Sequence, residues 1–206
     1  MGVADQKIYL ASKSPRRREL LRQIGVEFEL LMLRDGGARD GAVSEVPHPN
    51  EAPADYVARI AREKAESGWA AVLWRKLPQR PVLAADTTVT IDGRILGKPA
   101  DTNEAISMLQ SLSGKTHQVL TSVAVMANEK LIQTTQCSDV TFGELSADML
   151  RAYCALSEPY DKAGAYGVQG YAAQFIQRIA GSYSGIMGLP LFETTQLLQQ
   201  AGIKIL

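Results

Sequence analysis

The stretch that decides the fold is residues 8–25, IYLASKSPRRRELLRQIG. Its first four residues are apolar and predict a short strand that leads into a polar turn. Ser14 is the expected N-cap of a helix and Pro15 its expected first residue. Leucine and isoleucine then recur at helical spacing up to Gly25, which is typical of a residue just beyond a helix C-terminus. We therefore expect a strand, a turn and a helix here.

The rest of the chain alternates between strand and helix patterns. Gly68 is expected to end the second helix, and the pairs Asp92-Gly93 and Asn128-Glu129 to form hairpin turns. Because hairpins and helical crossovers both occur, we predict the α/β class with mixed α+β character, in which helices flank a central twisted mixed sheet. The expected strands are 26–33, 81–85, 88–91, 94–96, 119–125, 131–142 and 174–179, the expected helices are 54–67, 101–113, 147–156 and 190–202, and 34–53 is expected to be a surface loop.

Composition narrows the classes of function. The chain has 206 residues, and its 22 Lys and Arg balance 22 Asp and Glu, so we expect no strong nucleic-acid binding and no polybasic membrane contact. No long uncharged apolar run and no signal-peptide pattern is present, which predicts a soluble cytoplasmic protein with no membrane partner. Cys137 and Cys154 are expected to be free, at least partly buried thiols, and His48 and His117 to be structural or exposed.

Three clusters of residues carry possible chemistry. The first is Ser12-Lys13-Ser14-Pro15-Arg16-Arg17-Arg18, in which three guanidinium groups crowd the N-terminal turn of a helix. Cations there oppose the helix dipole, so the arrangement favours a bound phosphate, which hydroxyls, backbone N–H groups and arginines can hold together. Solvated or ion-paired arginines are the alternative, and Arg18 is the expected bystander.

The second cluster joins a carboxylate to an ammonium. Asp86 follows a buried apolar strand, at the end where open α/β sheets place their ligands. Lys98 follows a hairpin that folds the chain back toward that strand, so both groups can converge on one substrate. A turn-capping Asp or a structural ion pair is the alternative.

The third cluster is Asp161 to Gly170, DKAGAYGVQG. Its glycines permit close backbone approach to a ligand, and Gln169 offers a donor and an acceptor that can read a base edge. Loop structure alone is the competing interpretation, as core packing is for Tyr166, Tyr171 and Tyr183.

In their order along the chain, these clusters resemble the Maf family, nucleoside triphosphate pyrophosphatases that act on non-standard or surplus nucleotides. The resemblance implies a single domain, residues 1–206, with two lobes around a substrate cleft, similar to Maf proteins and inosine triphosphatases. It also implies a homodimer. The motifs that carry it are SKSPRR at 12–17, AREKA at 61–65, ADT at 85–87 with GKP at 97–99, LSGKTH at 112–117 and DKAGAYGVQG at 161–170.

The resemblance assigns roles to residues of this chain. Asp86 would be the proton acceptor or metal-linked carboxylate that activates water, with Mg²⁺, or Mn²⁺ in its place, as the divalent cation. Base specificity would lie with Arg16, Thr87 and Gln169, where the branch acting on 7-methyl-GTP differs. The residues that would hold the triphosphate are Ser12, Arg16, Arg17, Lys64 and Lys98.

One step departs from the family pattern. Relatives carry an Ile-Asp-Glu type of acidic step after the second strand, whereas this chain has Leu33-Arg34-Asp35. Asp35, Asp40 or Glu45 could replace that carboxylate, and we leave all three outside the predicted site.

The predicted function is metal-dependent hydrolysis of dTTP and UTP to the nucleoside monophosphate and pyrophosphate, with the nucleotide as small-molecule partner. Two alternatives stay open. The enzyme could act on 7-methyl-GTP or on modified pyrimidine triphosphates, or the chain could be a non-catalytic regulator of cell division that binds nucleotides or nucleic acid.

Overall fold

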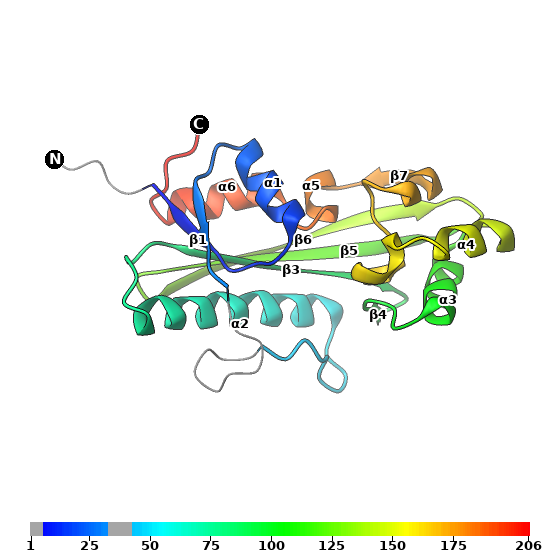
Figure 1. The fold of residues 1–206 in the computed structure, drawn as a ribbon, viewed down its shortest axis with the longest axis horizontal. Coiled ribbons are helices and arrows are strands. Elements are labelled where there is room, and N and C mark those ends of the chain that lie inside the picture. Colours follow the sequence, from blue (N-terminus) through cyan, green and yellow to red (C-terminus); the bar gives the residue numbers. More distant parts are fainter. Residues whose placement is uncertain (1–5, 33–42) are drawn as a thin grey trace.

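The computed structural model describes residues 6–32 and 43–206. Its described strands form one seven-stranded mixed sheet in the order β2-β1-β3-β5-β6-β7, with β4 paired to β3. The predicted mixed sheet flanked by helices is confirmed (Figure 1). The strands are β1 Ile8–Leu10, β2 Phe28–Leu30, β3 Val82–Ile91, β4 Arg94–Leu96, β5 Thr116–Ala127, β6 Lys130–Phe142 and β7 Ile176–Ala180.

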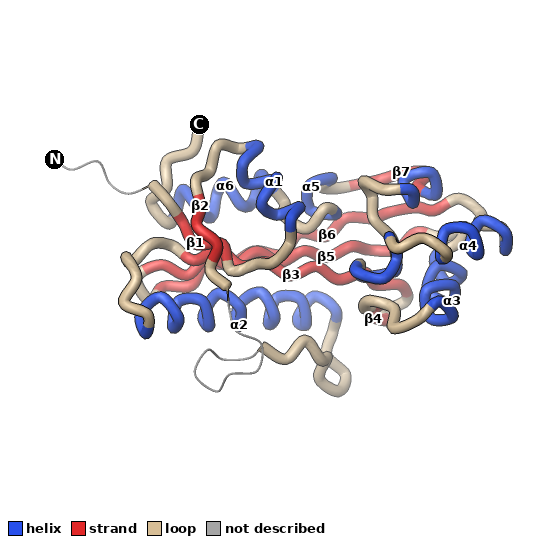
Figure 2. Tube along the Cα trace, viewed as in Figure 1, coloured by secondary structure: helices blue, strands red, loops and turns tan. Residues whose placement is uncertain are grey.

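Helices cover both faces of this sheet. The helices are α1 Pro15–Gln23, α2 Pro53–Trp74, α3 Thr102–Leu112, α4 Ala147–Cys154, α5 Tyr183–Ile186 and α6 Leu191–Gln200, with short 3₁₀ turns at Glu158–Asp161, Ala163–Ala165 and Tyr171–Phe175. Figure 2 shows β3, β5 and β6 running through the middle of the molecule, with α2 on one side and α1 and α6 on the other.

The first strand–turn–helix unit forms as expected. Strand β1 lies parallel to both β2 and β3, and the other strand pairs are antiparallel. Helix α1 begins at Pro15 after Ser14, and Gly25 lies just beyond its end with a positive φ of 70°. Strand β2 is shorter than the predicted 26–33, while both predicted hairpin turns are confirmed because β3–β4 and β5–β6 pair around them.

Apolar side chains form a core at each end of the sheet. One cluster lies beneath α1 and α6 and includes Leu10, Leu83 and Leu198, and another lies beneath α2 around Trp69 and Val82. A larger cluster packs α3 and α4 against the far ends of the long strands. The division of a single domain into two lobes stays a prediction.

The prediction that Gly68 ends a helix is wrong, because α2 continues to Trp74. A Cβ at Gly68 would lie 2.7 Å from Cγ1 of Val82, so the missing side chain lets the helix pack closely on β3. The glycine is therefore needed for contact with the sheet, which its neighbours in sequence do not reveal.

The prediction that a strand ends before Asp86 is also wrong, since Asp86 lies in the middle of β3. On one edge, β3 pairs with β1 as far as Leu83 and with β4 from Val89 onward. Among the described residues no strand pairs with that edge between these two points. Asp86 is therefore a residue of β3 that lies just beyond the point where β1 ends. The edge of β3 beside it has no partner strand among the described residues.

Smaller differences concern loops and thiols. Helix α5 and the 3₁₀ turns were not predicted, and part of the expected loop 34–53 lies outside the described residues. Cys154 is buried and free as expected, whereas Cys137 is free but exposed, contrary to the expectation of at least partial burial. No helix in the described part of the chain is long and apolar enough to cross a membrane.

Candidate functional site

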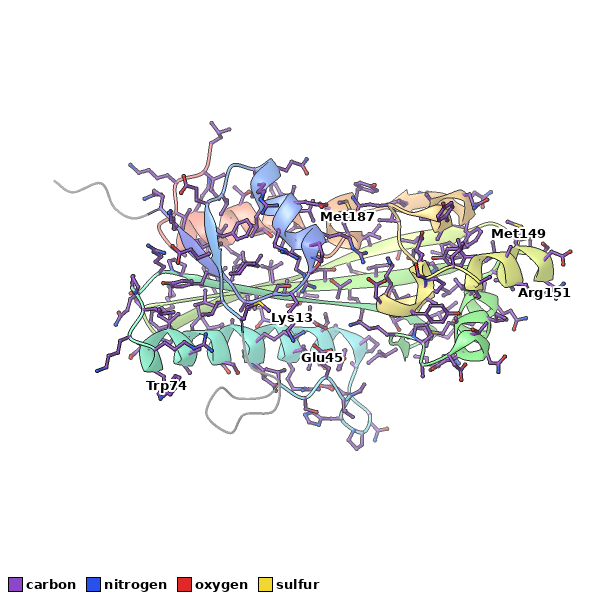
Figure 3. All side chains as sticks on the ribbon, viewed as in Figure 1. Lys13, Glu45, Trp74, Met149, Arg151 and Met187 are labelled. Carbon is purple, nitrogen blue, oxygen red and sulfur yellow. The ribbon has the colours of Figure 1, made fainter. Side chains whose placement is uncertain are left out.

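A cavity of about 890 Å³ lies where β1 stops and β3 continues. Its wall combines the loop before α1, the segment before α2, the middle of β3 and the 3₁₀ region after α4. Figure 3 labels two residues of this wall, Lys13 between α1 and α2 and Glu45 at α2. Seven of the eight residues predicted for the site line it, and these are Ser12, Arg16, Arg17, Lys64, Asp86, Thr87 and Lys98.

Three hydrogen bonds hold Arg17 in the site. Its Nε donates to the carbonyl of Gly188 over 2.8 Å, and its two terminal nitrogens donate to Oγ of Ser12 at 3.2 Å and Oγ1 of Thr87 at 3.3 Å. Burial lowers the pKa of Arg17, and the negative charges of Asp86 and Glu45 partly offset that effect. Every partner named here is a neutral oxygen, so the charge of the guanidinium remains available to an anion in the cavity.

Ser14 is the N-cap residue of α1, but its side chain leaves the first N–H groups of the helix free. The side chain of Ser14 makes no capping hydrogen bond, and its backbone N–H donates to Oγ of Ser12 over 3.2 Å. A helix N-terminus with free N–H groups carries partial positive charge. Arg18 donates to the carbonyl of Lys13 and is not part of the cavity wall, as expected of a bystander.

Lys64 lies between two carboxylates. Its Nζ is 2.8 Å from Oδ1 of Asp86 and 2.6 Å from Oε1 of Glu45. Both Lys64 and Asp86 are largely buried, with side chains 18% and 13% exposed. Burial alone would raise the pKa of Glu45, but the hydrogen bond and charge of Lys64, with Lys98 and Arg17, hold that pKa below its usual value.

Glu45 is held in place from α2. The carbonyl of Glu45 accepts from the hydroxyl of Tyr56 over 2.9 Å, and Arg59 donates to the carbonyls of Ser44 and Val46 on either side. Burial, together with the charges of Asp86 and Glu45, raises the pKa of Tyr56 to about 12, so this hydroxyl keeps its proton. The backbone at Glu45 is thus fixed by the helix that also carries Lys64.

The third cluster forms part of the cavity wall and contacts α1. Asp161 lies 3.9 Å from a terminal nitrogen of Arg16, and Lys162 donates to Asp161. The N–H of Gly164, at φ 70°, donates to the carbonyl of Gly97 over 3.0 Å, where a Cβ would meet Val89 at 2.9 Å. This contact brings the third cluster beside exposed Lys98.

Gln169 is the predicted residue that the structure does not bring into the wall. It is exposed, and its neighbour Val168 is the last residue of the third cluster that lines the cavity. Tyr166 does line the cavity and is buried, as the core-packing interpretation expects, whereas Tyr171 and Tyr183 are exposed.

Neither histidine lines this cavity. His48 is exposed, and His117 is buried, with its Nε2 2.8 Å from the hydroxyl of Tyr166. Burial lowers the pKa of His117 to about 4, so its ring is neutral at physiological pH. The expectation that both histidines are structural or exposed is confirmed.

Sequence reasoning considered Glu45 as a replacement carboxylate but left it out of the site. Asp35 and Asp40, the other two possibilities, lie outside the described residues. Tyr56 and Thr121 were missed altogether, since each looks like an ordinary core residue and only its hydrogen bond reveals its position. The sequence held one signal for Glu45: a Pro-rich run joins it directly to the helix that carries Lys64, the residue that Glu45 contacts.

Comparison with known proteins shows the family of the chain. The chain is 55% identical over 206 residues to a protein of Aromatoleum aromaticum named dTTP/UTP pyrophosphatase, with both chains covered completely. It is 52% identical over 198 residues to a protein of that name from Nitrosomonas europaea, 96% of each chain being covered. A relative from Cupriavidus metallidurans with the same name is 53% identical over 196 residues, or 95% of this chain and 97% of the relative. The family model described as Maf-like protein matches residues 7–201, and the chain therefore belongs to the Maf family.

Proposed function

We propose that this protein hydrolyses nucleoside triphosphates, above all dTTP and UTP, to the nucleoside monophosphate and pyrophosphate. One observation carries the proposal: a single cavity holds the carboxylate of Asp86 together with the cationic side chains of α1, α2 and the loop after β4. The names of the relatives from A. aromaticum and N. europaea support the substrates.

The cations meet the first requirement of the reaction, which is to neutralise a triphosphate. Arg17 is half-buried and held by neutral partners, Arg16 lies at the first turn of α1, and Lys98 is exposed. A volume of about 890 Å³ is within the range of sites that enclose a ligand of nucleotide size. Fixed cations of this kind stabilise charge as it develops on a phosphoryl group during attack.

Asp86 meets the second requirement, which is to direct a water molecule at the α-phosphoryl centre. Its Oδ1 accepts from Lys64, which leaves the other carboxylate oxygen for a water or a cation. Positioned carboxylates act in this way as general bases or as water-orienting groups.

The residues present also fit a divalent cation. Asp86 and Glu45 both contact the ammonium of Lys64, so two carboxylates already surround one positive charge. Mg²⁺ binds through one or two carboxylates together with substrate phosphates, and we propose that these two side chains hold Mg²⁺, or Mn²⁺, when the nucleotide enters. Once bound, the ion would polarise phosphoryl oxygens and lower the pKa of water. No group of three His, Cys, Asp or Glu side chains in the described residues forms a metal site without substrate.

Base preference is proposed to depend on Arg16, Thr87 and Gln169. Arg16 and Thr87 line the cavity, and the exposed Gln169 follows its wall by one residue. We also propose that the protein is a cytoplasmic homodimer. Sedimentation velocity of the purified protein tests whether it is a dimer.

The experiment that tests the function is pyrophosphate release from a panel of triphosphates with Mg²⁺ and then with EDTA. The panel contains dTTP, UTP, CTP, dCTP, GTP and 7-methyl-GTP. Metal-dependent release confined to dTTP and UTP supports both the reaction and its substrates, and preference for 7-methyl-GTP would move the protein to the other branch. Absence of release from every member would refute the proposal.

A further inference from the structure

Four groups beside the cavity form a continuous hydrogen-bonded chain. A terminal nitrogen of Arg17 donates to Oγ1 of Thr87 over 3.3 Å, and Oγ1 of Thr87 lies 3.0 Å from Oγ1 of Thr121. Oγ1 of Thr121 lies 2.8 Å from the carbonyl oxygen of Gly185. Thr87 and Thr121 face each other across the β3–β5 pair, and Thr121 is fully buried.

The donor and acceptor properties of the four groups fix the direction in which each hydrogen bond of this series is donated. A carbonyl oxygen cannot donate, so the single proton of the Thr121 hydroxyl is used by Gly185. Thr121 must then accept from Thr87, which commits the Thr87 proton as well. At the other end a guanidinium can only donate, so Arg17 occupies one of the two lone pairs of Thr87.

Thr87 therefore presents one lone pair and no proton to the cavity that it lines. Ser12, on the other side of Arg17, has the opposite polarity. Its Oγ accepts from Arg17 and from the backbone N–H of Ser14, so its proton is free to donate. Ser12 is thus suited to an anionic oxygen, and Thr87 to a ligand N–H or O–H.

We infer that Thr121 is a positioning residue that commits the Thr87 hydroxyl proton to the protein interior, so that Thr87 selects a base with an N–H at the point of contact. This inference rests on the proposed function and deepens it. Thymine and uracil carry an imide N–H at N3, where cytosine carries a bare acceptor nitrogen. When cytosine enters, its N3 acceptor faces the lone pair of Thr87 and no hydrogen bond forms. A pocket rejects such a ligand because its own buried polar group is left unpaired.

The test compares kcat/KM for dTTP, dCTP and N3-methyl-dTTP, because the last retains thymine but lacks the imide proton. In Thr121→Val the shape is kept, while Thr87 loses its acceptor and can turn its proton toward the ligand. We expect the dTTP-to-dCTP ratio of kcat/KM to fall by about tenfold or more. The carbonyl of Gly185 keeps the N–H of Gly188 at 2.9 Å, so it is not left unpaired by the change.

Two variants separate this role from a structural one. Thr121→Ser retains the hydroxyl and should restore the ratio. Thr90→Val changes a buried threonine on β3, the strand of Thr87, whose hydroxyl has no hydrogen-bond partner among the described residues, and it should leave the ratio unchanged. Thermal unfolding of each variant confirms that the protein compared is folded.

Three results would overturn the inference: an unchanged ratio in folded Thr121→Val, an equal loss in Thr121→Ser, or wild-type turnover of N3-methyl-dTTP at the rate of dTTP. Each of these requires turnover of a pyrimidine nucleotide. Failure of the wild type to release pyrophosphate from any substrate refutes the proposed function itself, and the inference with it.

Discussion

Lys64 of α2 donates to Asp86 of β3 over 2.8 Å, and this hydrogen bond joins the long helix to the middle of the strand. The pair is largely buried, and removal of one partner from such a pair leaves the other charge uncompensated. Glu45 adds a second carboxylate to the same ammonium. Lys64 therefore holds two acidic groups together that would otherwise repel each other.

The carboxylate of Asp86 is the first group to remove. Asp86→Asn keeps the shape of the side chain but removes its charge and its basic oxygen. We expect kcat for pyrophosphate release to fall by about 100-fold or more while the circular dichroism spectrum is retained. Asp92→Asn is the matched control, because Asp92 lies in the β3–β4 turn at φ 52°, a conformation that asparagine accepts, and activity should be unaffected. Full activity of Asp86→Asn would exclude Asp86 from the mechanism.

Arg59, which holds the segment that carries Glu45, forms an ion pair with Glu51, and the stability that this pair contributes should depend on pH. Nε of Arg59 lies 2.7 Å from Oε1 of Glu51, and this hydrogen bond, opposed by burial and aided by the N–H of His48, lowers the pKa of Glu51 to about 2. A carboxylate with a depressed pKa stabilises the fold above its unfolded value of about 4.5, and that contribution is lost as the pH falls from there to about 2. Glu51→Gln should therefore be less stable than the wild type at pH 7, and the difference should vanish toward pH 2.

Urea unfolding across this pH range measures the effect, and KM for dTTP at pH 7 should rise in the same variant because Glu45 is held less firmly. Exposed Glu66 on α2 supplies the control, Glu66→Gln, for which neither change is expected. A stability difference between Glu51→Gln and the wild type that persists at pH 2 would show that the ion pair of Arg59 and Glu51 is not its cause.

His117 makes a second pH-dependent contribution. Burial lowers its pKa to about 4, whereas the unfolded chain has the usual value of 6.5. Between these values the unfolded chain binds more protons than the fold, so stability is full above pH 6.5 and is lost as the pH falls toward 4. From this shift we expect a loss of about 2 kcal/mol between pH 7 and pH 5.

The measurement is urea unfolding of the wild type and His117→Gln at both pH values. The variant should lack this part of the pH dependence, whereas His48→Gln, at an exposed position, should retain it. An identical pH dependence in His117→Gln and the wild type would show that another group is responsible.

Gly68 should be intolerant of even the smallest side chain. In a helix interior, Gly→Ala normally stabilises by about 1 kcal/mol. Here the added Cβ would lie 2.7 Å from Val82, and overpacking of this kind costs about 1–3 kcal/mol, so Gly68→Ala should lower the free energy of unfolding. Ser67→Ala, one position earlier and only partly buried, should change it by about 0.5 kcal/mol or less. A stabilised Gly68→Ala would mean that α2 can move away from the sheet at no cost.

Local signals in the sequence predicted local structure. Asp101 accepts from the N–H of Glu104, and Ser146 from that of Met149, so each caps the helix that begins at the next residue. Asp92, Gly93 and Asn128 are residue types that tolerate positive φ, and all three adopt it in the two hairpin turns. In each of these places the deciding contacts lie within a few residues.

The errors arose where distant residues decide. Gly68 looked like a helix terminator, yet its role comes from contact with Val82 on another element. Asp86 looked like a strand end, yet β5 pairs with the strand through and beyond it. A residue pattern cannot show how far a partner strand extends, because pairing energy comes from the partner.

By itself, the sequence determined the element types, the mixed sheet and the residue types that an anion site needs, because propensities, caps and motif order are written locally. Only the tertiary structure decided that Glu45 joins Asp86 at Lys64, that Gln169 is exposed beyond the cavity wall, and that Thr121 directs the proton of Thr87. The physical reason is that a hydrogen bond depends on distance and direction in space, and residues far apart in the chain acquire both only when the sheet and its helices pack together.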